Sequence, residues 1–162
     1  MDRGMSKKVP PGFFDQIAHI YDEVRPGYPE EMIKDIISIS GIPDGGRILE
    51  IGCGTGQATI PFAKRGYYMI CLDISKEMAF LTAKKCRKYP KVHVYPISFE
   101  EWELEPNSFD LVISGTAFYW IPKEVAYPKA ALALKDSGYL AVFLELPPNS
   151  LYWFLQRSSE GI

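Results

Sequence analysis

The stretch RILEIGCGTGQA, residues 47–58, decides how the rest of the chain is interpreted. An apolar run leads to the acidic Glu50, and three glycines follow at alternate positions, Gly52, Gly54 and Gly56. Glycine permits a sharp turn and lets a ligand approach the backbone closely. The pattern therefore predicts a buried strand that leads into a ligand-binding loop at the start of a helix.

The length of 162 residues is that of one domain. With 47% hydrophobic and 23% charged residues, the composition is that of an ordinary globular protein. Its formal net charge of -2 argues against a nucleic-acid-binding protein that relies on a basic surface. Three cysteines without CxxC spacing indicate neither a disulfide framework nor a zinc site, so we expect no metal and a cytoplasmic location. The sequence has no apolar stretch typical of a signal peptide or a membrane span, and we expect no membrane contact.

Short apolar runs alternate with helical patterns along the chain. The near-continuous hydrophobicity of the runs favours strands that are buried on both faces, as in a parallel sheet. The expected strands are 47–51, 67–74, 92–98, 109–114 and 139–146. The expected helices are 13–24, 29–40, 55–66, 75–89 and 123–138, the last restarting at Pro128.

This alternation predicts a single α/β domain over residues 1–162, with a mainly parallel open sheet and helices on both faces. Its parts are an N-terminal helical segment (1–44), a Rossmann-like core (45–146) and a tail (147–162). Ligands of such sheets bind at the carboxyl ends of the strands, where the strand order switches. The glycine loop after the first strand is therefore the candidate site.

Glu50 indicates the charge of the ligand. A carboxylate ~4 Å from another unit charge exchanges about 4 kcal/mol at an effective dielectric constant of ~20. That energy is repulsive for a pyrophosphate and attractive for an ammonium or a sulfonium group. The G-x-G-x-G spacing also differs from the G-x-G-x-x-G of dinucleotide-binding folds. Both features favour a cationic small molecule over NAD or ATP, although Glu50 could instead pair with a lysine or an arginine, or cap the loop.

Two later segments fit a nucleoside. Asp73, at the end of the second expected strand, can accept hydrogen bonds from both hydroxyls of a ribose, or it can cap the helix that follows. Ile74 would lie against a purine, or it is a core residue. After the third expected strand, Ser98 and Phe99 can flank the purine, with the Phe99 N–H reaching a ring nitrogen, or they belong to a short helical turn.

These elements together resemble the class I S-adenosylmethionine-dependent methyltransferases. The resemblance rests on EIGCGTG (50–56), LDIS (72–75) and FDLVISGTAFYWI (109–121), and YDEVRPGYP (21–29) is similar to the N-terminal segment of small-molecule methyltransferases. It implies a Rossmann-like fold, S-adenosyl-L-methionine as the cofactor, and in-line transfer of its methyl group to a small molecule.

The resemblance also implies a role for each matching residue. The methionine part of the cofactor would be held by Glu50, Gly52, Cys53, Gly54 and Gly56. Asp73 would bind the ribose, and the base would be framed by Ile74, Ser98 and Phe99. Ser114 and Gly115 would approach the amino-acid end or the sulfonium, while Tyr21 and Arg25 would close the site.

The chain departs from the family pattern at Tyr119-Trp120, because relatives often carry a histidine before the tryptophan. We therefore expect Tyr119 to orient a substrate and Trp120 to wall its pocket, or both to be core aromatics. We assign no catalytic base, since positioning alone can supply roughly 7–11 kcal/mol of the barrier.

The tail departs as well. The family fold has seven strands, and we expect about five here, followed by the start of a helical insert that shapes the substrate pocket. The fifth strand would then be an open edge, and the apolar patch 151–155 would suit a partner such as a second copy of the chain. The alternative function is therefore a catalytically silent, truncated cofactor-binding module that associates with a partner.

Overall fold

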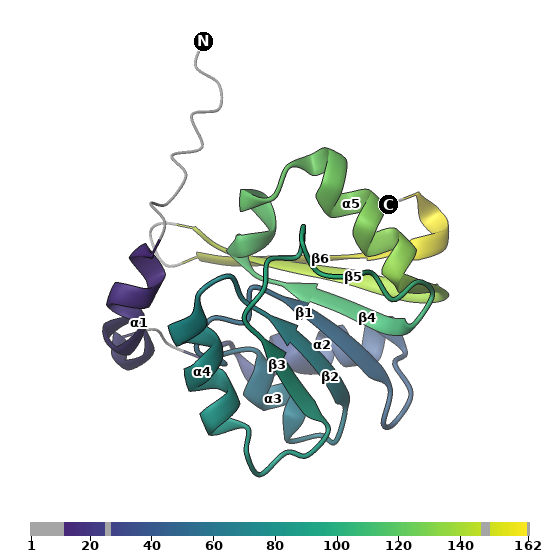
Figure 1. Cartoon of the computed structure of the whole chain (residues 1–162). Coiled ribbons are helices and arrows are strands. Elements are labelled where there is room, and N and C mark those ends of the chain that lie inside the picture. The colour runs from purple at the N-terminus through teal and green to yellow at the C-terminus, as the bar shows by residue number, and fades with distance from the viewer. Residues whose placement is uncertain (1–11, 25–26, 147–149, 162) are drawn as a thin grey trace.

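A six-stranded sheet in the order β3-β2-β1-β4-β5-β6 forms the centre of the computed structural model, which describes residues 12–24, 27–146 and 150–161 (Figure 1). Five strands run parallel, and β6 pairs antiparallel with β5. Their bounds are β1 Arg47–Ile51, β2 Tyr68–Leu72, β3 Val92–Tyr95, β4 Phe109–Ser114, β5 Leu134–Leu146 and β6 Ser150–Arg157. The predicted α/β fold with a mainly parallel sheet is confirmed.

The helices are α1 (Phe13–Val24), α2 (Glu30–Ser40), α3 (Thr59–Ala63), α4 (Lys76–Lys85) and α5 (Lys123–Ala133), with short 3-10 helices η1 (Thr116–Trp120) and η2 (Ser158–Glu160). Their ends have local causes. The Ser75 hydroxyl accepts a hydrogen bond from the Met78 N–H at 3.2 Å and so starts α4. Gly41 adopts a left-handed φ of 63° and ends α2. Within the described ranges, none of the helices combines the length and the apolarity needed to cross a bilayer.

Helices cover both faces of the sheet because successive strand residues point to opposite faces. In β1, Ile48 belongs to the core that includes residues of α2 and α3. Leu49, the next residue, belongs to the core that includes residues of α5, which lies over the upper face in Figure 1. Glu50 then points to the side of α3. The site is therefore positioned by a strand with a packed core on each face.

The strand order switches at β1, which pairs with β2 on one side and with β4 on the other. The chain leaves β1 and β2 at the same edge of the sheet, since these strands are parallel. This arrangement brings the glycine loop after Ile51 next to Asp73, which follows β2. The predicted location of the loop at the switch in strand order is confirmed.

The expectation for the tail is wrong. Residues 150–157 form β6 instead of the start of a helical insert, so the sheet has six strands and not five. The physical reason is that β6 buries apolar side chains on both sides of the sheet. Leu151 and Leu155 pack on the core beneath α2, while Phe154 packs on the core beneath α5. Pairing with β5 overrides any local preference for a helix.

β6 also changes the edge of the sheet. It covers β5, which is therefore not the open edge that the sequence suggested. Within the predicted patch 151–155, Tyr152 and Trp153 are the exposed large side chains. Association with a partner or a second copy through this patch stays a prediction.

The passage from α5 to β5 also differs from the expectation. The helix runs through Pro128 without restarting and ends at Ala133, not at Gly138. Leu134 already pairs with Phe109, whereas the next pair joins Tyr139 with Leu111. The intervening residues of β5 bulge out of the ladder, and early pairing with β4 thus replaces the last turn of the expected helix.

We predict that Phe62→Ala lowers the free energy of unfolding by about 3–5 kcal/mol, because the Phe62 side chain is fully buried between α3 and the sheet. The matched control is Phe80→Ala on α4, where the side chain is 59% exposed and the loss should stay within about 0.5 kcal/mol. Urea unfolding followed by circular dichroism measures both. Equal losses in the two variants would contradict this assignment of the core.

Candidate functional site

The glycine loop is fixed to the end of β2 by main-chain hydrogen bonds. The N–H groups of Gly52 and Cys53 both donate to the carbonyl oxygen of Leu72, at 2.8 and 2.9 Å. The N–H of Gly54 donates to Oδ2 of Asp73 at 2.8 Å. The loop therefore has a defined shape before any ligand arrives.

This shape requires glycine. Gly52, Gly54 and Gly56 have φ values of 72°, 59° and 98°, which other residues rarely adopt. At Gly52 there is also no room, because a Cβ atom there would collide with the Cβ of Ala117 in η1. The loop after β1 thus lies directly against the segment that follows β4.

Glu50 is a buried carboxyl group at the floor of the loop, with only 3% of its surface exposed. The hydroxyl of Thr59, the first residue of α3, donates a hydrogen bond to its Oε1. Burial raises the pKa of Glu50 to about 8, although the Thr59 hydrogen bond opposes the shift. The negative charge of Asp73 contributes to the rise. A salt bridge from Glu50 to a lysine or an arginine, the alternative that the sequence left open, is not found among the described residues.

Asp73 braces both the loop and α4. Its Oδ2 accepts the Gly54 N–H, and its Oδ1 accepts the Ser75 N–H at 2.9 Å. Burial raises the pKa of Asp73 to about 6, and the two backbone hydrogen bonds oppose the shift. Asp73 thus supports the helix start, as the alternative interpretation expected. Each carboxylate oxygen has a second lone pair, which leaves acceptor capacity for the hydroxyls of a ligand.

A small cavity of about 70 Å³ lies above Glu50. Of the residues predicted from the sequence, it is lined by Glu50, Gly52, Cys53, Gly54 and Gly115. The lining residues that sequence reasoning missed are Tyr28, Gln57, Ala58, Thr116, Ala117 and Phe143. Tyr28 lies within the YDEVRPGYP stretch, one residue before its end at Pro29, so its position in that motif was a signal that could have revealed it.

Tyr28 forms one wall of this cavity. Its ring packs edge-to-face on Phe143 of β5, with the ring centroids 4.8 Å apart. Its hydroxyl lies 3.1 Å from the point where a Cβ of Gly115 would sit. Gly115 therefore allows the Tyr28 hydroxyl to approach the backbone at the end of β4.

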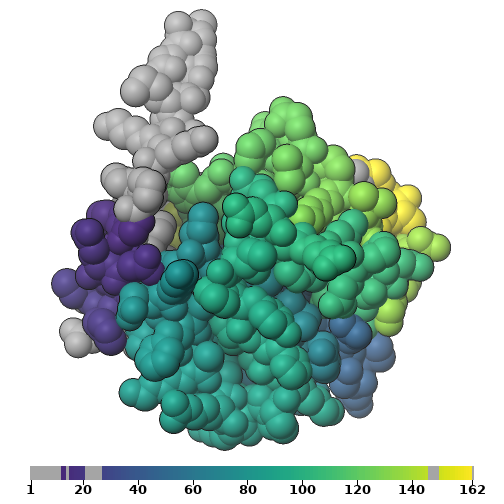
Figure 2. All heavy atoms as spheres, viewed as in Figure 1, coloured from purple at the N-terminus to yellow at the C-terminus, as the bar shows by residue number. Residues whose placement is uncertain are grey.

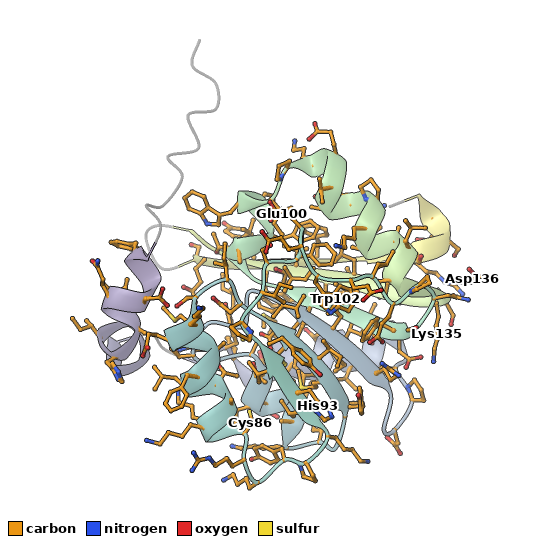
Figure 3. All side chains as sticks on the ribbon, viewed as in Figure 1. Cys86, His93, Glu100, Trp102, Lys135 and Asp136 are labelled. Atoms are coloured by element: carbon orange, nitrogen blue, oxygen red, sulfur yellow. The ribbon has the colours of Figure 1, made fainter. Side chains whose placement is uncertain are left out.

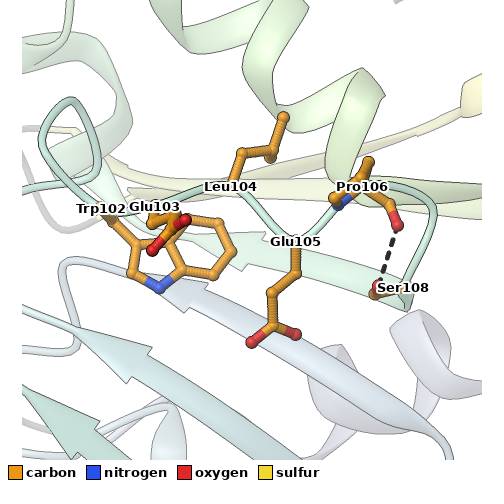
Figure 4. Close-up of a pocket in the computed structure, with 6 residues that line it drawn as sticks. All are labelled: Trp102, Glu103, Leu104, Glu105, Pro106 and Ser108. Carbon is orange, nitrogen blue, oxygen red and sulfur yellow. Dashed lines mark hydrogen bonds between the residues drawn. The ribbon is translucent and has the colours of Figure 1, made fainter.

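A larger hollow of about 500 Å³ lies elsewhere, along Trp102, Glu103, Leu104, Glu105, Pro106 and Ser108 (Figure 4). It is a shallow, open groove. Ser108 immediately precedes β4 and its hydroxyl donates to the Pro106 carbonyl oxygen at 2.9 Å. The groove thus reaches the amino end of β4, away from the glycine loop, and we do not assign the site to it.

On the side expected for the base, the Ile74 side chain is 73% exposed and is therefore accessible to an apolar ligand surface. Ser98 is engaged locally, since its hydroxyl oxygen accepts the Glu101 N–H at 3.1 Å. The prediction for the Phe99 ring is wrong, because the ring is buried in the core and stacks on Trp102 at 6.2 Å. The backbone of Phe99, not its ring, is what remains for a base.

Ser114 requires a second correction. Its side chain is fully buried, and its hydroxyl donates to the carbonyl oxygen of Ile51 at 2.8 Å. Ser114 thus ties β4 to β1 and does not line the cavity, whereas its neighbour Gly115 does. The register of the two strands, which the sequence does not reveal, turns this side chain inward.

Tyr119 and Trp120 are both close to half exposed, at 46% and 47%, so the alternative that they are core aromatics is wrong. The buried aromatic of η1 is Phe118, which packs edge-to-face on Tyr127 of α5 at 5.0 Å. Tyr119 and Trp120 are therefore available to a molecule that approaches from outside.

The N-terminal helix α1 docks on α4 close to Asp73. Oδ1 of Asp15 accepts hydrogen bonds from the Ser75 hydroxyl at 2.6 Å and from the Glu77 N–H at 3.0 Å. These bonds lower the pKa of Asp15. Figure 2 shows α1 packed against the side of the molecule that carries α4. Of the two residues expected to close the site, Arg25 and the side chain of Tyr21 lie outside the described residues.

The three cysteines and His93 are packed against other parts of the fold. Cys53, Cys71 and Cys86 are free and buried, and burial raises the pKa values of all three thiols. His93 lies on β3, where its ring packs against that of Tyr68 at 5.2 Å (Figure 3). In the described part of the chain, no three histidine, cysteine or acidic side chains lie close enough together to hold a metal ion.

Comparison with known proteins identifies the family. Residues 48–138, more than half of the chain, match the family described as "Methyltransferase domain". The chain belongs to this methyltransferase family. An uncharacterized methyltransferase of Schizosaccharomyces pombe is 31% identical over 134 residues, which is 82% of this chain and 52% of that protein. The chain spans about half the length of the curated relatives it matches.

Solved structures share the methyltransferase fold. Phosphoethanolamine N-methyltransferase 2 of Haemonchus contortus, solved with phosphomonomethylethanolamine and S-adenosylhomocysteine, matches with a TM-score of 0.70 and 23% identity over 83% of this chain and 34% of that one. The [4+2]-cyclase SpnF matches with a TM-score of 0.71 and 16% identity over 85% of this chain and 60% of its own. At these identities the likeness establishes the fold, and SpnF shows that the fold is not limited to methyl transfer.

We predict that the methyltransferase domain loses stability as the pH rises from about 4.5 to about 8. The folded state holds a proton on Glu50 in this window, whereas the unfolded state has released it. The free energy of unfolding should therefore fall by up to about 1.4 kcal/mol per pH unit from this group. Glu50→Gln, which imitates the protonated form, should match the wild type near pH 5 and exceed it at pH 9.

Urea unfolding at pH 5, 7 and 9 measures this effect. Glu103→Gln, at an exposed position, is the matched control and should follow the wild-type pH profile. A Glu50→Gln variant with the wild-type slope would show that Glu50 does not carry the buried proton.

Proposed function

We propose that this chain binds S-adenosyl-L-methionine and supports transfer of its methyl group to a small-molecule acceptor. The observation that carries the proposal is the pair of carboxyl groups, Glu50 and Asp73, at the ends of adjacent strands on either side of a left-handed glycine loop. Membership of the methyltransferase family and the S-adenosylhomocysteine bound by the Haemonchus contortus enzyme support it.

The residues around the glycine loop fit the chemical groups of this cofactor. Glu50 lines the small cavity, and its ionised form would attract a sulfonium or an ammonium group and repel a phosphate. Asp73 accepts hydrogen bonds from ribose hydroxyls with its remaining lone pairs. Ile74 offers an exposed apolar side chain to the base, and the backbone of residues 98–99, which follow β3, would supply its polar contacts.

The cavity must widen to admit the cofactor. Its volume of about 70 Å³ is far below the roughly 300–1,000 Å³ of pockets that hold drug-sized ligands. Ala117 packs on Gly52, and Tyr28 packs on Gly115, so these two contacts close the space. We expect η1 or Tyr28 to move outward when the cofactor binds.

The chain's own residues act by positioning. The bound cofactor supplies an electrophilic methyl carbon on a cationic sulfur. Glu50 and the glycine loop hold the charged end, while Tyr28 and η1 exclude water from it. The exposed Tyr119 and Trp120 form the surface that an acceptor meets. Alignment of the acceptor atom with the methyl carbon supplies the catalytic effect, and we assign no general base.

The location of the protein follows the same reasoning. Three free thiols, all buried in the described part of the chain, suit a reducing compartment. We propose that the protein acts in the cytoplasm on a soluble acceptor.

Asp73→Ala tests the proposal. The wild type should bind S-adenosylhomocysteine, and the variant should bind it roughly 100-fold more weakly, because two charge-assisted hydrogen bonds to the ribose are lost. Isothermal titration calorimetry measures both dissociation constants. The control is Asp44→Ala, an exposed aspartate before β1 and thus at the opposite edge of the sheet, which should bind like the wild type.

Two results would overturn the proposal. One is a wild type that does not bind S-adenosylhomocysteine at millimolar concentration. The other is a folded Asp73→Ala variant, checked by circular dichroism, with the affinity of the wild type.

A further inference from the structure

Lys129 of α5 makes a set of contacts that the proposed function does not use. Its ammonium group donates hydrogen bonds to three main-chain carbonyl oxygens, those of Phe99 at 2.6 Å, Trp102 at 2.6 Å and Glu100 at 3.2 Å. A lysine ammonium has three protons, so all of its donors are engaged. The three acceptors lie 27 to 30 residues before Lys129 in the sequence.

The acceptors belong to one helical turn. The Trp102 N–H donates to the Ser98 carbonyl oxygen at 2.9 Å, and the Glu101 N–H donates to the Ser98 hydroxyl oxygen at 3.1 Å. A helical turn leaves the carbonyl oxygens of its last residues without partners. Lysine side chains often bind such oxygens at the end of their own helix. Here the lysine comes from another helix.

The Lys129 ammonium also contacts the aromatic rings of the turn. The Lys129 ammonium lies 5.1 Å from the ring centroid of Phe99 and 5.9 Å from that of Trp102. These rings are buried and stack on each other. Figure 3 shows Glu100 and Trp102 on the loop that passes beneath α5. A single cation therefore fixes both the carbonyl oxygens and the rings of this turn.

The other end of the turn lies at the carboxyl edge of the sheet, where the proposed site is. Ser98 and Phe99 begin the turn, shortly after the end of β3. Because β3 is parallel to β2, this places them near the carboxyl end of β2. For the described residues, the structure gives the backbone N–H of Phe99 no hydrogen-bond acceptor. In the proposed function this N–H faces the base. The rings point into the core, so only a fixed backbone can recognise the base here.

We propose that Lys129 is a positioning residue for the adenine base: it fixes the turn 98–102 so that the Phe99 N–H is held ready for a ring nitrogen. The proposal rests on the proposed function, because it concerns the same cofactor. It adds a residue that touches neither the cavity nor the glycine loop. α5 thereby supports both the base-binding turn, through Lys129, and η1, through the packing of Tyr127 on Phe118.

The test compares Lys129→Met with Lys123→Met. Methionine keeps an unbranched apolar stem and removes the ammonium, and Lys123 is an exposed lysine on the same helix. Calorimetry with S-adenosylhomocysteine and with 5′-methylthioadenosine, which lacks the amino-acid end, should give the same increase in dissociation constant for Lys129→Met. We expect about 10- to 100-fold for both ligands, and wild-type values for Lys123→Met.

A second measurement separates positioning from stability. In Lys129→Ala the lost atoms correspond to propylammonium, so adding this cation should restore much of the affinity, whereas neutral 1-propanol should not. If the methionine variant does not fold, Lys129→Gln replaces it with the same expected direction. A folded variant that binds both ligands like the wild type, or rescue by propanol as effective as by propylammonium, would overturn the proposal.

The two proposals can fail separately. A wild type that does not bind S-adenosylhomocysteine removes the proposed function and this inference with it. A wild type that binds it while folded Lys129 variants bind equally well removes only the role of Lys129.

Discussion

The hydrogen bond from the Gly54 N–H to the Asp73 carboxylate connects the parts on which the site depends. It joins the loop after β1 to the end of β2, and the same carboxylate receives the Ser75 N–H at the start of α4. The glycine loop, Asp73 and the helix start are therefore one unit. Any ligand that reaches this edge of the sheet meets a preformed surface of backbone and acidic groups.

The two carboxyl groups in this unit differ in their surroundings. Burial raises the pKa of both groups, to about 8 for the enclosed Glu50 and to about 6 for Asp73. The rise is limited at Asp73 because two backbone N–H groups stabilise its charge. A cation next to Glu50 would stabilise its ionised form. Binding of a sulfonium and ionisation of Glu50 are thus coupled, and this coupling distinguishes the proposed cofactor from a nucleotide whose phosphates would carry negative charge to the same place.

The sequence predicts the parts of the fold that depend on local pattern. β1 and β4 match their predicted bounds, because buried parallel strands read as continuous apolar runs. The glycine loop and Asp73 were also predictable, since both follow directly from strand ends. The roles of Ser114 and Phe99 were not, because strand register and core packing decide where a side chain points. Phe143 escaped prediction for the same reason, because it meets Tyr28 only in the folded chain.

The most direct test of the account measures the dissociation constants of S-adenosylmethionine and S-adenosylhomocysteine between pH 6.5 and 9. The two molecules share every titrating group and differ in the charge on sulfur. If the ionised Glu50 attracts the sulfonium, the ratio of the two constants should shift toward S-adenosylmethionine by up to tenfold per pH unit below about pH 8 and then level off. A ratio that does not change with pH, or an equal preference of the protein for ATP, would contradict the account.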